Sequence, residues 1–499
     1  IKYDKNLLIS SKERIHFKFK DIDSFINKST LWLKDDVLKM DETYINIGEV
    51  AKAKLSFIYS LEKNKGEIKT NRLRIKTQAL GTLYMQSYDT NFDISKKEDN
   101  FHISSNDLGM SFLYNKEGWK LDLNSVLRLA RNSALLQKYD LTKGTLAINK
   151  NVSDSNIKIK ATLYSANKVM VVDNTPLEKY TINGEVDTNT NIISLRVNDY
   201  VKVVIDKDVF VYVKDIGINL NAIADIINAK NGDLKNYSSA NVLLKADNTY
   251  LFISPTRHLL SEKINLSYSH KLLKATLKHQ EGIANLKFKN GVFHIDGNNF
   301  NDVFMENLFA LSKFKNGSFN FTVSGTPNQY DGLFTMSNTT LLEYKLLNNI
   351  LAFVNTVPTL VTFSIPNYNA SGLLVKNAYM KFKSKDDIFY ISDIFLDSAE
   401  LNILGQGTAS ILHNTIDLDL NLKTDLGSSV SKVPLVGYIL MDDDSISTGL
   451  KITGELNNPN IQSKIFKDIA VAPLNILLRT ITLPFYLFNS IDINTTEKE

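Results

Sequence analysis

The chain lacks cysteine altogether and is poor in proline and glycine, with nine and 22 of these residues in 499. The absence of cysteine excludes disulfides, thiol nucleophiles, iron–sulfur clusters and cysteine-based zinc sites. Few prolines and glycines mean few tight corners, so long strands are favoured. The charge is almost balanced, with 58 basic and 54 acidic residues and a net charge of +4, which argues against a polyanion-binding protein.

Sequence patterns of catalytic and metal sites are also missing. No G-x-S-x-G elbow or Walker loop occurs, and Gly405-Gln406-Gly407 lacks the third glycine of a dinucleotide cradle. The acidic run Asp442–Ser445 lacks the alternate spacing and the glycine of a calcium loop. The histidines form no i,i+4 pair on a helix and no metal-ligand spacing with a carboxylate: His16, His102, His258, His270, His279, His294 and His413. We therefore expect no enzyme, no metal and no cofactor.

A basic stretch at Lys69–Lys76 alternates with Leu73 and Ile75. Binding of single-stranded nucleic acid would call for aromatic stacking partners in the same element, and these are missing. We interpret the stretch as the solvent face of a strand, with contact to anionic lipid headgroups as the alternative.

What the sequence does contain is alternation of apolar and polar residues with period two, which is typical of strands with one apolar face. Turn pairs such as Asn290-Gly291 and Asn316-Gly317 separate the segments, which predicts antiparallel hairpins. The prediction is a mainly β chain, an elongated and curled antiparallel sheet forming a β-groove, with a repetitive region 1–330 and a C-terminal region 331–499. The clearest alternating segments are 15–20, 157–162, 201–213, 286–289, 319–323 and 416–422.

Helical spacing is confined to a few segments. Helices are predicted at Ser125–Lys138, at Leu220–Ala229 and near 341–354, where Thr340 and Glu343 have the spacing of a capping box. The apolar stretch 466–488 is interrupted by prolines and by Arg479, so broken helices are expected there. They would pack against the body of the protein, lie at a membrane interface or span a membrane. The candidates for membrane contact are Leu474, Leu477, Leu478, Leu483, Phe485 and Leu487.

Four stretches in order resemble the C-terminal region of the AsmA-like superfamily, which includes AsmA, TamB and YhdP. They are Gly317–Leu341, Ile391–Asn421 with its Gly-x-Gly interpreted as a turn between two strands, Val433–Leu440 and Leu450–Pro459. The resemblance implies a Gram-negative cell-envelope protein in the periplasm, anchored in the inner membrane by an upstream segment. It also implies a curled β-sheet with an apolar groove that carries phospholipids between membranes and supports the outer membrane.

One apolar row per strand, repeated along the chain, makes a continuous apolar stripe. An open groove would leave this stripe for acyl chains, whereas a sandwich would cover it with a second sheet, and alternation alone does not separate the two. The predicted function is phospholipid binding and transfer, with phospholipids, the inner or outer membrane and envelope proteins as partners and no nucleic acid. The alternative is a structural scaffold or assembly factor. The groove candidates are Val201, Val203, Ile205, Val211, Leu286, Phe288, Phe319, Phe321, Val323, Ile416, Leu418 and Leu420.

Overall fold

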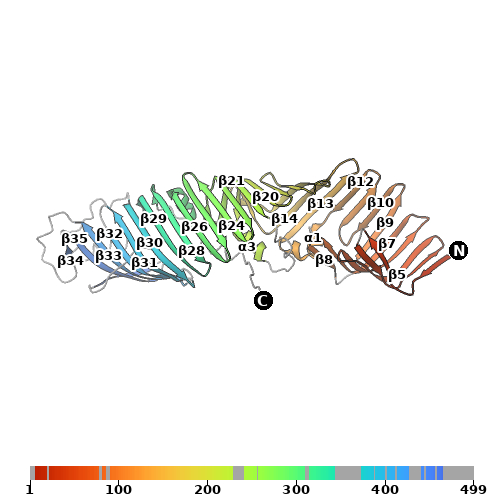
Figure 1. Ribbon diagram of the computed structural model, residues 1–499, viewed down its shortest axis with the longest axis horizontal. Helices are drawn as coiled ribbons and strands as arrows, with labels where there is room; N and C mark the ends of the chain where they lie inside the picture. Colours follow the sequence, from red (N-terminus) through yellow and green to blue (C-terminus); the bar gives the residue numbers. More distant parts are fainter. Residues whose placement is uncertain are drawn as a thin grey trace. The chain divides into compact units, whose positions relative to one another are not determined.

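The chain is described by a computed structural model, drawn in Figure 1. The described residues are 6–19, 22–77, 81–85, 90–228, 241–255, 257–309, 314–342, 372–386, 388–398, 402–410, 413–425, 440–442, 445–455 and 458–464. Two compact units follow from the contacts. Unit 1 comprises Ile1–Val213 with Asp225–Ala240, and unit 2 comprises Lys214–Ala224 with Asn241–Glu499.

Unit 1 is an antiparallel meander in which most strands pair with the next one along the chain, as strands β9 to β14 do in Figure 1. The pairs β1–β4, β7–β9 and β14–β17 pass over short intervening strands. Its strands are β1 Asn6–Ser10, β2 Ile15–Phe19, β3 Ile22–Ile26, β4 Thr30–Lys34, β5 Val37–Ile47, β6 Ala51–Ser60, β7 Lys65–Thr77, β8 Gly81–Met85, β9 Thr90–Lys97, β10 Asn100–Ser105, β11 Met110–Asn115, β12 Gly118–Leu123, β13 Leu141–Asn151, β14 Asn156–Ser165, β15 Met170–Val172, β16 Thr175–Pro176, β17 Lys179–Asp187, β18 Ile193–Val197, β19 Val201–Ile205 and the start of β20 Val209–Asn219.

The register of these pairs lines apolar side chains up in rows, because directly opposed residues of an antiparallel pair face the same side of the sheet. One row crosses seven strands of unit 1 through Leu121, Ile148, Ile159, Gly184, Leu195, Val203 and Val211. Below, this set is called the apolar row. The neighbouring row consists of Leu123, Leu146, Ala161, Ile182, Val197, Val201 and Val213. The row on the opposite face runs through Lys120, Asn149, Lys158, Glu185 and Ser194 and ends in Val204 and Phe210, so this face is polar over β12, β13, β14, β17 and β18.

Two short helices cover part of the apolar face of unit 1. The helix predicted over 125–138 is split into α1 (Val126–Ala130) and α2 (Ala134–Gln137), since Ser133 caps the second helix by accepting a hydrogen bond from the Leu136 N–H at 3.2 Å. α1 contacts β13, and α2 contacts β8. The buried core here is small: Ala53, Leu73, Leu108, Leu123, Val126 and Leu129.

Unit 2 is a second antiparallel meander, with β28 to β33 side by side in Figure 1. Its strands are β21 Val242–Ser254, β22 Arg257–Leu259, β23 Lys263–Ser269, β24 Leu272–His279, β25 Gly282–Lys289, β26 Val292–Phe300, β27 Phe314–Lys315, β28 Ser318–Thr326, β29 Gln329–Leu341, β30 Leu373–Lys385, β31 Ile388–Ser398, β32 Asn402–Ser410, β33 Thr415–Asp425, β34 Leu440–Asp442, β35 Ser445–Glu455 and β36 Asn458–Lys464. Its helices are α3, Leu220–Asn228, which runs past the unit boundary at Ala224, and α4, Asp302–Phe309.

The rows of unit 2 are buried far more deeply than those of unit 1. One row runs through Leu286, Ile295, Val323, Gly332, Phe382, Ile391, Gly407, Leu418, Ile452 and Ile461. Leu418 and Ile452 are 0% exposed, and α4 adds Phe304, Met305 and Leu308 to the same buried cluster. Unit 2 therefore has a continuous core, whereas the apolar row of unit 1 is only half-buried throughout.

The prediction of a mainly β, antiparallel chain with a few short helices is confirmed. The helix predicted at Leu220–Ala229 is α3. The predicted start of the helix near 341–354 is wrong, because Thr340 and Leu341 continue β29 and pair with Leu374 and Leu373. Residues 343–354 and 466–488 lie outside the described residues.

Two further features differ from the expectations. Gly405 and Gly407, which were interpreted as a turn, lie inside β32. Each is the cross-strand partner of a leucine on β33, and a glycine leaves room for that side chain. The boundary expected near residue 330 falls within β29 of unit 2, and the separate roles of 1–330 and 331–499 stay a prediction.

Candidate functional site

Four of the predicted groove residues lie together on the apolar face of unit 1. Val203 and Val211 are direct cross-strand partners in the apolar row, and Val201 and Ile205 flank Val203 on the same face of β19. All four side chains are half-buried. At Gly184, where the apolar row has no side chain, a Cβ atom would lie 2.4 Å from Cδ2 of Leu195, so the leucine covers that position and keeps the row continuous.

The other eight candidates lie on the apolar face of unit 2, and the register brings them into common rows. Leu286, Val323 and Leu418 share one row; Phe288 and Ile416 share a second; Phe321 and Leu420 share a third. Phe319 lies in a fourth row, opposite Phe300. Leu286 and Phe321 are half-buried, and the remaining six are at most 7% exposed. In unit 2 the candidates are thus core residues of the protein itself.

The polar face of unit 2 is stabilised by charge pairs. The Lys451 ammonium pairs with Asp417 and lies 3.2 Å from Asp419, its neighbour on the same face of β33. Partial burial alone would lower the pKa of Lys451, but the hydrogen bonds to the two carboxylates outweigh it and raise the pKa. Lys381 and Tyr379 approach Asp393 in the same way. At these positions the face therefore carries paired charged and polar side chains.

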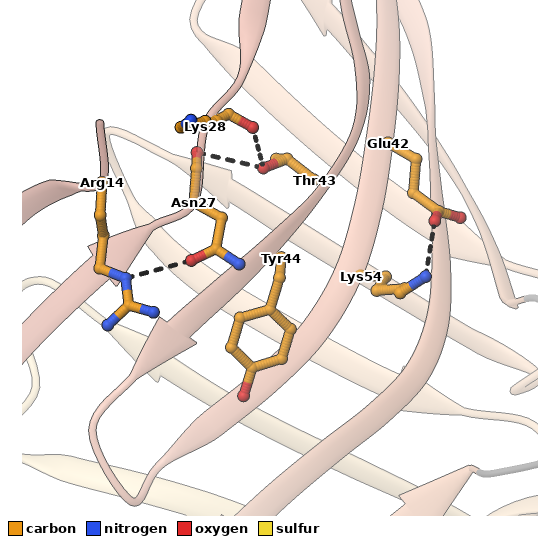
Figure 2. A pocket seen from close by; sticks show the side chains of 7 residues that line it. All are labelled: Arg14, Asn27, Lys28, Glu42, Thr43, Tyr44 and Lys54. Carbon is orange, nitrogen blue, oxygen red and sulfur yellow. Dashed lines mark hydrogen bonds and ion pairs between the residues drawn. The ribbon is translucent and has the colours of Figure 1, made fainter. Parts of the chain in front are cut away.

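A pocket of about 530 Å³ opens at the start of unit 1, and sequence reasoning did not anticipate it. It is lined by Arg14, Asn27, Lys28, Glu42, Thr43, Tyr44 and Lys54, which are shown in Figure 2. These residues come from the segments around β2, β3, β5 and β6, so no local motif marks them. The only signal in the sequence is a set of basic residues close to aromatic ones.

The described histidine and carboxylate groups are spread over the two units. No cluster of three or more potential metal ligands occurs among the described residues. His279 pairs with Glu262 at 3.0 Å and packs on Phe304, which is a structural contact under α4. Burial lowers the pKa of His258, which lies between the rings of Tyr250 and Phe252.

The basic residues of Lys69–Lys76 are exposed on β7, while Leu73 is buried, as expected for the solvent face of a strand. The membrane-contact candidates Leu474, Leu477, Leu478, Leu483, Phe485 and Leu487 lie outside the described residues. Within the described part of the chain, no helix has both the length and the apolar character needed to cross a membrane.

Comparison with known proteins places this architecture in a family. No curated protein matches the sequence. The family model described as YhdP protein matches residues 211–461, which is half of the chain and includes nearly all described strands of unit 2. The match extends the resemblance seen after residue 316 upstream by about a hundred residues, to β20. The chain belongs to the YhdP protein family of AsmA-like envelope proteins.

Proposed function

We propose that the chain binds the acyl chains of phospholipids on the apolar face of unit 1 and passes them along that face within the cell envelope. The observation that carries the proposal is the apolar row, which runs through seven strands in unbroken register and stays half-buried. A soluble protein normally buries such a surface or uses it to bind a partner.

The dimensions of the row suit an acyl chain. Seven strands are separated by six intervals of roughly 4.8 Å, so the apolar row extends for about 29 Å. A bilayer core is about 30 Å thick and holds two leaflets, so one acyl chain needs about half of the row. Each methylene that leaves water for the row gains about 0.8 kcal/mol, and similar sites in series let a chain move without meeting one deep trap.

The charge of the headgroup favours a fixed orientation of the lipid. A charged headgroup does not enter an apolar surface without a partner, because burying an unpaired charge is costly. The headgroup therefore stays in water beside the strands while the acyl chains lie on the row. Family membership supports an envelope location, and we propose the periplasm, with phospholipids and the inner or outer membrane as partners and no catalytic step.

The test compares two double variants on the same two strands. Leu195→Asp with Val203→Asp places carboxylates in the apolar row, and Ser194→Asp with Val204→Asp places them at the adjacent pair on the opposite face. The phospholipid that copurifies with each protein is measured by mass spectrometry of lipid extracts. We expect L195D/V203D to retain less than about one third of the wild-type lipid, since unpaired carboxylates repel acyl chains.

The S194D/V204D protein should retain nearly all of the lipid, and its far-UV circular dichroism spectrum should match that of L195D/V203D. Equal lipid content in the two variants, or no lipid in the wild-type protein, would refute the proposal.

A second candidate function is a structural scaffold or assembly factor of an envelope machine. It is favoured by unit 2, whose candidate residues Phe319, Leu418 and Leu420 are 0% exposed and so belong to the core of the protein. A scaffold predicts stable protein partners in the envelope, which cross-linking of the intact chain followed by mass spectrometry would detect. The region 331–499, with its apolar stretch 466–488, is proposed as the part that contacts the membrane interface.

A further inference from the structure

We infer that the pocket lined by Arg14, Lys28 and Lys54 is an anion site that binds the phosphate group of a phosphate ester. The inference does not rest on the acyl-chain proposal, because the two sites lie on opposite faces of unit 1. Tyr44 and Lys54 are direct cross-strand partners and both line the pocket. Their chain neighbours Ile45 and Ala53 face the other way and belong to the apolar cluster.

The net positive charge of the lining residues favours the binding of an anion. Three basic side chains and one carboxylate line it, which gives a net charge of +2. Glu42 is paired with Lys54 at 3.1 Å. Among the described residues, no carboxylate lies within ion-pair distance of Arg14 or Lys28, so both cations are available to a ligand. A phosphate diester carries one negative charge and a monoester carries nearly two at neutral pH, which matches the excess.

Arg14 is held in position before any ligand arrives. Its guanidinium carbon lies 4.0 Å from the centre of the Phe25 ring, and its Nε–H donates to Oδ1 of Asn27 at 3.2 Å. These contacts occupy one N–H and one face of the guanidinium group. The two terminal nitrogens have the fork geometry that binds two phosphate oxygens at once. Preorganisation of this kind lowers the entropy lost on binding.

The backbone around the pocket is fixed as well. A β-bulge in β5 between Met40 and Thr43 puts one extra residue against β6 and directs Glu42 towards Lys54. The Thr43 hydroxyl donates to the carbonyl oxygens of Asn27 and Lys28, at 3.3 and 3.2 Å. The segment that follows β3 and carries Lys28 is thereby tied to β5.

The size and the lining of the pocket indicate a ligand larger than inorganic phosphate. A volume of about 530 Å³ lies within the usual range for small-molecule sites. In Figure 2, Tyr44 stands between Arg14 on one side and the Glu42–Lys54 pair on the other. Tyr44 also lines the pocket, and its ring forms an aromatic wall beside the cations. A phosphate bound by the cations would leave its organic substituent, such as glycerol, against this wall.

The chemistry fits two sources, a phospholipid headgroup in a membrane or a soluble phosphate ester. The experiment uses the full chain and three probes: inorganic phosphate and glycerol 3-phosphate by titration calorimetry, and sedimentation with vesicles of phosphatidylglycerol against vesicles of phosphatidylcholine. The test variant is Arg14→Gln with Lys28→Gln. The matched control is Arg196→Gln with Lys202→Gln, an exposed Arg–Lys pair on the polar face of β18 and β19 that makes the same change in net charge.

We expect R14Q/K28Q to weaken binding by about tenfold or more and the control by less than about twofold, because only the first pair contacts the ligand. If R14Q/K28Q binds glycerol 3-phosphate more weakly than the wild type does, the ligand is a soluble ester. If only its binding to phosphatidylglycerol vesicles is weaker, the ligand is a lipid headgroup. Glu42→Gln should strengthen binding, because it removes the one carboxylate and releases Lys54. Equal binding by R14Q/K28Q and its control, or weaker binding by E42Q than by the wild type, would overturn the inference.

Discussion

Replacement of Leu420 by alanine tests whether the apolar face of unit 2 is filled by protein. The Leu420 side chain is 0% exposed, and its cross-strand partners are Leu450, also 0% exposed, and Gly405. Since Gly405 has no side chain that could move into the space, the cavity should collapse little. Leu→Ala in such a site costs about 2–5 kcal/mol, and the upper half of the range, about 3–5 kcal/mol, is expected here.

The assay is urea unfolding followed by far-UV circular dichroism. With a slope of about 1–3 kcal/mol per M urea, a loss of about 3 kcal/mol lowers the midpoint by about 1–3 M. Both tryptophans, Trp32 and Trp119, lie in unit 1, so their fluorescence follows unit 1 and serves as an internal reference. Leu404 is the matched control, because it lies on β32 beside Gly405 and is 46% exposed.

Leu404→Ala should change the free energy of unfolding by less than about 0.5 kcal/mol, as surface substitutions usually do. If Leu420→Ala cost no more than Leu404→Ala, the reasoning would be refuted. The apolar face of unit 2 would then be accessible, and the acyl-chain proposal would extend to it.

Two further predictions concern stability. Gly332→Val should destabilise unit 2 by about 1–3 kcal/mol or more, because even a Cβ atom would lie 1.8 Å from Cζ of Phe382; urea unfolding measures the loss, and Phe382→Leu in the same chain should restore part of it. Burial lowers the pKa of His258 below its unfolded value of 6.5, so the unfolded chain binds the proton better. The contribution of His258 to the free energy of unfolding is therefore complete above pH 6.5 and is lost as the pH falls through the lowered pKa. Between about pH 7.5 and about pH 5, the free energy of unfolding should therefore fall less for His258→Gln than for the wild type. An equal fall in the two proteins would contradict this.

The strands could be predicted from the sequence because their signal is local. Alternation at Val201–Ile205 and at Ile416–Leu422 is produced by the same one-sided burial that the sheet shows. The helix α4 was missed although signals exist: Asn301 caps it by accepting from the Phe304 N–H at 2.9 Å, and Phe304 and Leu308 have helical spacing. The helix is short and lies between two strands, so its helical pattern was difficult to distinguish from the neighbouring alternation.

Features that depend on distant parts of the chain could not be predicted. Thr340 and Leu341 have a good helix-start pattern, yet pairing with β30 keeps them in a strand. Val203 and Leu418 have the same alternating surroundings in the sequence, but one is half-buried and the other is fully buried. Alternation in the sequence shows which face of a strand is apolar, but it does not show what covers that face. The anion pocket depends on a bulge and on three strand pairings, neither of which leaves a local pattern.

The pairing of each strand mainly with its chain neighbours has a consequence for how such proteins change in length. A hairpin added to the meander needs new partners only at its two sides, as a repeat does in a solenoid, so the remaining strands keep their registers. Insertion or loss of strand pairs would then lengthen or shorten the sheet in steps of about 9–10 Å, the width of two strands. Strand pairs are gained or lost by this route while the rows of the remaining strands are kept.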